Sequence, residues 1–331
     1  MSHNNVSDFS KDADTAKAVI LSVEGVTVSD AEAALFEAAN PLGFILFARN
    51  IETPEQVLTL NNRLKEIVGR DCPILIDQEG GRVARFKPPI WRGYPAGQMY
   101  GAIAEVDMPR GLAEMSTRTK QIAQELRASG VNVNCDPVLD VLRPETHDVI
   151  GDRAYSEKPD IVAEMGLAVC RDYLSSGIQP IIKHIPGHGR AMADSHLELP
   201  RVDASLEAMR ELDFKPFAHV AQSDIGAQVW AMSAHILYTA IDAELPLTLS
   251  SKGIADILRG EIGFDGVLVS DDVSMKALDA YGDLPQLCAD SIEAGCDLAL
   301  YCAGKLDEMR AIVKAVPNLT ENALKRLQSG A

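Results

Sequence analysis

The sequence predicts a single-domain α/β protein with a (β/α)8 TIM-barrel fold, formed by residues 17–331 after a polar N-terminal tail at 1–16. Eight short apolar segments alternate with helical segments, which indicates a parallel sheet. The segments are almost continuously apolar, as strands buried on both faces are. Eight such units in roughly 300 residues fit this barrel. A doubly wound open sheet is the alternative, but the first turn, VEGVTVSD, has no GxGxxG fingerprint.

The expected strands follow one another in chain order and are separated by the expected helices. They are AVILSV (18–23), GFILFA (43–48), PILID (73–77), VNVNCDP (131–137), PIIKHI (180–185), QVWAMSAHI (228–236), GVLVSDD (266–272) and DLALYCA (297–303). The helix after the second strand carries the clearest signals: a capping box of Thr53 and Gln56, Pro54 in the first turn, and Gly69 at its end. Three more helices each end at a glycine that leads into the next strand, at Gly130, Gly177 and Gly295.

Composition excludes several classes of partner. The 331 residues carry a formal net charge of -17, which argues against binding to nucleic acid or to an anionic lipid surface. No segment approaches the ~20 apolar residues that a transmembrane helix needs, and the first residues have no apolar signal region. The six cysteines are scattered without a CxxC pair, so we expect buried free thiols in a cytoplasmic protein.

Charged residues follow five successive strands. In a TIM barrel the active site lies at the carboxyl ends of the strands, so these side chains are expected to share one cleft. In chain order they are Asp77, then Arg153 in a long loop, then Lys183 and His184, then His235, then Asp271 and Asp272.

The stretch KHIPGHGRAMADSHLELP (183–200) contains His184, His188 and His196 and allows three interpretations. A metal site is disfavoured, because Ile-Pro-Gly prevents a helix between the first two histidines and Lys183 would repel a cation. A structural corner stays open on these residues alone. Proton transfer is the third interpretation, because Asp194 could orient His196 and favour its protonated form.

Proton transfer by a histidine needs a nucleophile on a neighbouring strand. Asp271 supplies a carboxylate at the end of VLVSDD. A carboxylate that attacks carbon, beside a group that gives and then takes a proton, is the chemistry of retaining glycoside hydrolysis. That scheme normally uses two carboxylates, whereas here the second role would fall to His196. No cofactor or metal is expected.

Five fragments together carry a resemblance to a known family. In chain order they are DQEGGRVARF, IGDRAYS, KHIPGHG, DSHLELP and FDGVLVSDDVSM. They resemble the family 3 glycoside hydrolases, and within them the single-domain bacterial β-N-acetylhexosaminidases. The resemblance spans nearly the whole expected barrel. Ile185 and Val273 stand where Phe and Leu are frequent in the family, and both replacements stay apolar.

The resemblance implies a role for each matching residue. Asp271 matches the nucleophile, His196 the general acid/base, and Asp194 the residue that orients it. Asp77 matches a ligand of sugar hydroxyls. The other positions that match substrate-binding residues are Arg85, Arg153, Lys183 and His184.

The implied enzyme is a cytoplasmic exo-β-N-acetylglucosaminidase, expected as a monomer, whose partner is a small aminosugar or muropeptide. It would release N-acetylglucosamine from a 1,6-anhydro-N-acetylmuramic acid unit, with or without peptide, in cell-wall recycling. The alternatives are a related family 3 glycosidase or phosphorylase with another sugar or acceptor preference, and a non-catalytic sugar-binding barrel.

Several polar residues are expected to have structural roles. Arg190 is interpreted as a solvated loop charge, with contact to an anionic part of the substrate as the alternative. Asp152 and Asp272 are expected to stabilise turns. Glu79 could hydrogen-bond its own loop rather than the sugar, and His235 is left open between core and site.

Overall fold

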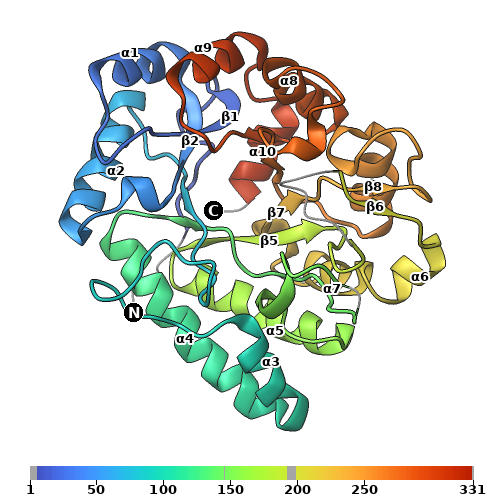
Figure 1. The fold of residues 1–331 in the computed structure, drawn as a ribbon. Helices are drawn as coiled ribbons and strands as arrows, with labels where there is room; N and C mark the ends of the chain where they lie inside the picture. The colour runs from blue at the N-terminus through green and yellow to red at the C-terminus, as the bar shows by residue number, and fades with distance from the viewer. Residues whose placement is uncertain (1–5, 145, 192–198, 330–331) are drawn as a thin grey trace.

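The structure is a computed structural model that describes residues 6–144, 146–191 and 199–329. Eight parallel strands close into a barrel in the order β1-β10-β9-β7-β5-β4-β3-β2, which confirms the predicted TIM-barrel fold (Figure 1). The barrel strands are β1 (Lys17–Ser22), β2 (Pro41–Leu46), β3 (Ile74–Ile76), β4 (Val133–Asn134), β5 (Gln179–Ile185), β7 (Trp230–Ser233), β9 (Leu268–Asp272) and β10 (Leu298–Leu300). Each expected apolar segment contains or overlaps one of them.

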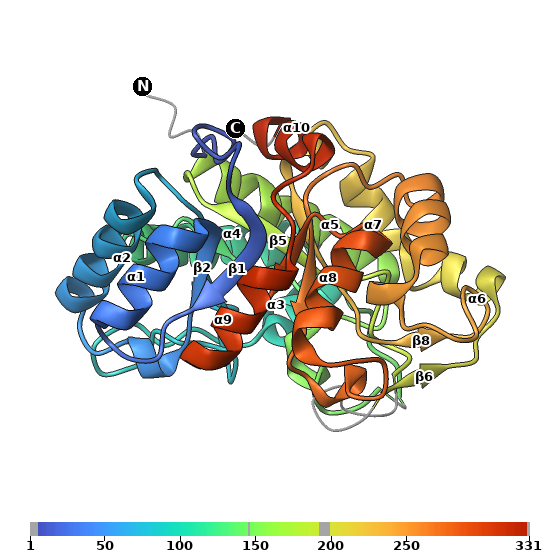
Figure 2. The same ribbon diagram turned by 90° about the horizontal axis from the view of Figure 1, so that it is seen from above.

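Helices surround the barrel, as the two views show (Figures 1 and 2). They are α1 (Asp30–Ala39), α2 (Pro54–Val68), α3 (Gly97–Val106), α4 (Met108–Ala128), α5 (Pro159–Ser175), α6 (Leu206–Glu211), α7 (Phe214–Ala221), a π-helix at Gly253–Glu261, α8 (Leu284–Ala294), α9 (Leu306–Ala315) and α10 (Glu321–Ser329). Two short strands outside the barrel, β6 (Arg201–Val202) and β8 (Leu237–Tyr238), pair in parallel. None of the helices in the described ranges is both long and apolar enough to cross a bilayer.

The start of α2 differs from the predicted capping box in one hydrogen bond. Thr53 accepts the backbone N–H of Gln56 through its hydroxyl, as expected. The Gln56 side chain, however, accepts the backbone N–H of Glu52 rather than that of Thr53, at 2.9 Å. The long Gln56 side chain also donates to the carbonyl of Val26, so it ties the start of α2 to the loop between β1 and α1.

The prediction that a helix ends at a glycine and leads directly into the next strand is confirmed at Gly130. After α4, Gly130 adopts a φ of 76°, which a residue with a Cβ rarely takes. Its N–H donates to the Arg127 carbonyl and the N–H of Val131 donates to the Leu126 carbonyl, both at 3.0 Å. This is the Schellman arrangement, and it turns the chain directly toward β4.

Residues 6–16, expected as part of a polar tail, pack against the barrel. Phe9 is buried, and its ring meets Trp230 edge-on at a centroid distance of 5.7 Å. Ala13 and Ala16 are buried as well. Because Trp230 begins β7, this segment covers the amino ends of the strands, and Figure 2 shows it beside α10.

Candidate active site

Six of the predicted site residues meet at the carboxyl ends of the barrel strands. They line one cleft. The predicted residues in its wall are Asp77, Arg85, Arg153, Lys183, His184 and Asp271. His196 and Asp194 lie outside the described residues. Residues 6–144, 146–191 and 199–329 contain no group of three or more His, Cys, Asp or Glu placed to hold a metal ion.

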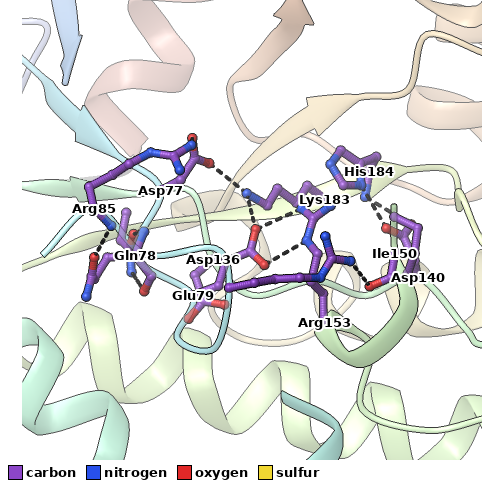
Figure 3. A network of polar contacts seen from close by, with 12 residues as sticks. Asp77, Gln78, Glu79, Arg85, Asp136, Asp140, Ile150, Arg153, Lys183 and His184 are labelled. Atoms are coloured by element: carbon purple, nitrogen blue, oxygen red, sulfur yellow. Dashed lines mark hydrogen bonds and ion pairs between the residues drawn. The ribbon is translucent and has the colours of Figure 1, made fainter. Parts of the chain in front are cut away.

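Lys183 is the centre of an ionic network in one wall of the cleft (Figure 3). It projects from β5, and its side chain is only 2% exposed. Its ammonium group lies 2.8 Å from Asp77 Oδ1 and 2.7 Å from Glu79 Oε1. Burial lowers the pKa of Lys183, but the two carboxylates outweigh burial and hold that pKa above its usual value. The ammonium group is therefore charged at neutral pH.

Asp77 follows β3 and joins two cations. Its second oxygen, Oδ2, accepts from Arg85 Nη2 at 3.0 Å. Burial raises the pKa of Asp77, but Lys183 and Arg85 together hold it well below the usual range. The Arg85 guanidinium also lies over the Phe47 ring, 5.1 Å from its centroid. These contacts hold an ionised carboxylate, which is an acceptor for sugar hydroxyls, at the edge of the cleft.

Glu79 binds Arg153 and shares Lys183 with Asp77, and sequence reasoning did not assign it to the site. Arg153 donates through Nε and Nη2 to both Glu79 oxygens, at 2.9 and 2.8 Å. Burial raises the pKa of Glu79, but Arg153 and Lys183 outweigh it and lower the pKa to about 2. The Glu79 carboxylate therefore does not hydrogen-bond its own loop, as we had expected, but binds Arg153 after β4 and Lys183 on β5. The feature of the sequence that could have pointed to Glu79 is its place in IDQEGG, two positions after Asp77.

We expect Glu79→Gln to reduce stability in a pH-dependent way. The pKa of Glu79 is about 2 in the folded protein and 4.5 ordinarily, so ionisation contributes on the order of 3 kcal/mol to folding. A lowered folded pKa contributes stability that is present above about pH 4.5 and lost as pH falls toward 2. Urea unfolding at several pH values measures this. The difference between wild type and variant should be constant above pH 5 and shrink below it; a constant difference down to pH 3 would contradict the assignment.

The loop from 148 to 153 is held against the loop after β3 by Arg82. Arg82 Nε lies 3.0 Å from Asp152 Oδ1, and Nη2 donates to the carbonyls of Val149 and Ile150. Asp152 therefore has the structural role expected of it. These contacts place the neighbouring Arg153 over the cleft.

Asp271 lies at the end of β9, in the opposite part of the cleft lining. Its Oδ1 accepts the backbone N–H of Asp272 at 2.8 Å. The Asp272 carboxylate accepts the N–H groups of Ser274 at 3.0 Å and Cys302 at 3.3 Å, so it stabilises the turn as expected. Burial, with a smaller contribution from Asp271, raises the pKa of Asp272.

His235 is a core residue that supports this turn. It is 1% exposed, and its Nε2 donates to the Asp272 carbonyl at 3.1 Å. Its Nδ1 lies 2.8 Å from Thr248 Oγ1. Burial lowers the pKa of His235, which favours the neutral ring. The open question about His235 is thus answered by a structural role behind the cleft.

Asp140, which sequence reasoning passed over, holds His184. Its Oδ2 lies 2.7 Å from His184 Nδ1, and Oδ1 accepts the backbone N–H groups of His184 and His188 at 3.1 and 2.7 Å. Burial raises the pKa of Asp140, but His184 outweighs it and the pKa falls to about 2. The place of Asp140 at the end of CDPVLD was its only signal in the sequence.

Arg190 is not the solvated loop charge that we expected. Its Nε lies 2.5 Å from Asp213 Oδ2, and Nη2 donates to the Ala208 carbonyl at 2.9 Å. Asp213 is only 2% exposed, and burial raises its pKa to about 6 although Arg190 opposes this. Asp213 lies just before α7 and beside the turn at Gly187, so it is within reach of the Arg190 side chain. For this reason Arg190 is paired rather than solvated.

Comparisons with known proteins agree with the geometry. The family description "Glycosyl hydrolase family 3 N terminal domain" matches residues 16–329. The chain belongs to glycosyl hydrolase family 3. The resemblance seen in the sequence is thereby confirmed.

Several beta-hexosaminidases are similar to this family 3 chain over most of its length. A beta-hexosaminidase of Alkalilimnicola ehrlichii is 35% identical over 300 residues, which is 91% of this chain and 84% of the relative. One from Stenotrophomonas maltophilia is 36% identical over 292 residues, 87% of this chain and 84% of the relative. The structure of NagZ from Neisseria gonorrhoeae, solved in complex with N-trifluoroacetyl-D-glucosamine, superposes on this chain with a TM-score of 0.86 at 29% identity. The match covers 96% of this chain and 90% of the NagZ chain. The chain is thus a glycoside hydrolase of the β-hexosaminidase group.

Proposed function

We propose that this chain is a retaining exo-β-N-acetylglucosaminidase of cell-wall recycling. It would release N-acetylglucosamine from N-acetylglucosaminyl-1,6-anhydro-N-acetylmuramic acid, with or without peptide. The observation that carries the proposal is the cleft itself, in which Asp271 at the end of β9 faces the same space as the buried network around Lys183. The aminosugar analogue bound to N. gonorrhoeae NagZ supports the choice of sugar.

In the first step, the Asp271 carboxylate attacks the anomeric carbon while the bond from that carbon to the leaving oxygen breaks. His196, oriented by Asp194, gives its proton to the leaving oxygen. The products are a glycosyl-Asp271 ester and the free leaving group. General acid assistance of this kind contributes about 10²- to 10⁴-fold to the rate.

In the second step, a water molecule attacks the same carbon from the face that the leaving group vacated. His196 accepts the proton of the water, and the ester bond to Asp271 breaks. Two inversions give net retention at the anomeric carbon. The histidine is protonated and the carboxylate is ionised again, so the cycle is complete.

The ionic wall would bind the non-reducing sugar. Asp77 is ionised and accepts hydrogen bonds from hydroxyl groups, whereas the N–H groups that Lys183 and Arg153 have left over can donate to hydroxyl or acetamido oxygens. Because each cation is already held by a carboxylate, the wall is preorganised and needs little rearrangement on binding.

The proposal predicts turnover of an aryl β-N-acetylglucosaminide and not of the matching aryl β-glucoside, with no loss of rate when a chelator is present. Initial rates on the two substrates, with and without EDTA, measure this. Equal rates on both sugars would contradict the assignment of the acetamido sugar. No release from either would favour the sugar-binding barrel, and faster turnover in phosphate than in an inert buffer would indicate a phosphorylase. The cytoplasmic location and the monomeric state stay predictions.

A further inference from the structure

The Asp140 carboxylate accepts three hydrogen bonds from the end of β5 and the loop that follows it. The three donors are the backbone N–H groups of His184 and His188 and the ring of His184. Figure 3 shows Asp140 beside His184. Asp140 itself is fully buried, so no solvent competes for its oxygens. Because an ionised carboxylate can only accept, Nδ1 of His184 must carry the hydrogen in this contact.

The other ring nitrogen of His184 faces different surroundings. His184 lines the cleft, and within the part of the chain that the structure describes its Nε2 has no hydrogen-bond partner. The ring also meets His188 edge-on at 5.5 Å between centroids, which restricts its rotation. With Nδ1 protonated, a neutral His184 offers Nε2 to the cleft as an acceptor rather than a donor.

We propose that Asp140 is a positioning residue that fixes the Nδ1–H tautomer of His184, so that Nε2 accepts the hydrogen of a substrate hydroxyl. The preceding residue, Lys183, has one N–H left after binding Asp77 and Glu79. A hydroxyl that accepts this N–H can donate its own hydrogen to His184 Nε2, which lines the same cleft. The pair would therefore recognise one hydroxyl by donating to it and accepting from it. The identity of this ligand as a sugar rests on the proposed function.

The tautomer can be measured without any activity. Imidazole ¹⁵N shifts distinguish a protonated from an unprotonated ring nitrogen, and His184→Gln identifies the signals of His184 among the seven histidines. In the wild-type protein at pH 8 we expect Nδ1 to be the protonated nitrogen of His184. A protonated Nε2 and a bare Nδ1 in the wild type would overturn the proposal, whatever the enzyme hydrolyses.

Asp140→Asn tests the cause. The Asn oxygen can still accept the two backbone N–H groups, but its amide group would donate to Nδ1 and so force the hydrogen onto Nε2. We expect the ¹⁵N pattern of His184 to reverse. Asp136→Asn is the matched control, because Asp136 is a buried carboxylate beside β4 that pairs with Arg118 at 2.9 Å. The control should lose stability but keep the wild-type pattern of His184; a reversal there as well would overturn the assignment to Asp140.

A double-mutant cycle tests whether Asp140 acts through His184. We expect Asp140→Asn to lower kcat/KM for the aryl β-N-acetylglucosaminide by about 100-fold in the wild type and by less than about threefold in the His184→Gln background. Affinity for N-acetylglucosamine, measured by calorimetry, should change in the same sense. A loss as large in the His184→Gln background would overturn the proposal. If the wild type hydrolyses no aryl glycoside, the proposed function fails, and the tautomer measurement still decides this inference.

Discussion

Asp271→Ala is expected to lower turnover of the aryl β-N-acetylglucosaminide by at least about 10⁴-fold, with the fold unchanged. The reason is that no other carboxylate is expected to replace it as the nucleophile, and the loss of a covalent nucleophile has effects of this size. The alanine leaves room beside the anomeric carbon, so azide should restore part of the rate. Because azide would enter from the face that Asp271 occupied, the product should be the α-glycosyl azide. Steady-state rates and analysis of the product by NMR measure both effects.

Asp272→Asn is the control for this variant. Its carboxylate contacts Ser274 and the Cys302 amide, and an asparagine oxygen can keep one of these contacts. It should retain more than about a hundredth of the wild-type rate and show no response to azide. If Asp272→Asn lost as much as Asp271→Ala and alone were rescued by azide, the nucleophile would be the second carboxylate.

His196→Ala is expected to separate substrates by their leaving groups. A poor leaving group, such as the sugar of the disaccharide, needs a proton as the bond breaks, so kcat/KM should fall by roughly 10²- to 10⁴-fold. A dinitrophenyl group leaves without a proton, so its kcat/KM should fall less than about tenfold. Rates on a series of aryl glycosides measure the dependence on the leaving-group pKa. An equal loss across the series would argue that His196 is not the leaving-group acid.

The fold and the location of the cleft could be predicted because they depend on patterns that are local in the sequence. Buried parallel strands are continuously apolar, and in PIIKHI and GVLVSDD charged residues follow the apolar start of the segment. The barrel then brings all strand ends to one face, so Asp77, Lys183 and Asp271 had to approach one another. The family motifs gave the same residues independently.

The partners of the charged residues could not be predicted, because they depend on how loops from different strands meet. Asp140 lies 44 positions from His184, and Glu79 lies 74 positions from Arg153. Nothing in their spacing shows that they form pairs. Arg190 was expected in solvent for the same reason, since its partner Asp213 lies 23 positions further on, just before α7.

The central claim is that Asp271 forms a covalent bond to the sugar, and trapping that intermediate tests it most directly. A 5-fluoro N-acetylglucosaminyl fluoride reacts at the anomeric carbon, and its fluorine slows the second step so that the ester accumulates. Proteolysis and tandem mass spectrometry then locate the sugar. The account predicts one sugar on the Asp271 carboxylate of the peptide that contains LVSDD, and none on Asp272. A sugar on any other residue, or steady turnover of the reagent without a protein adduct, would contradict it.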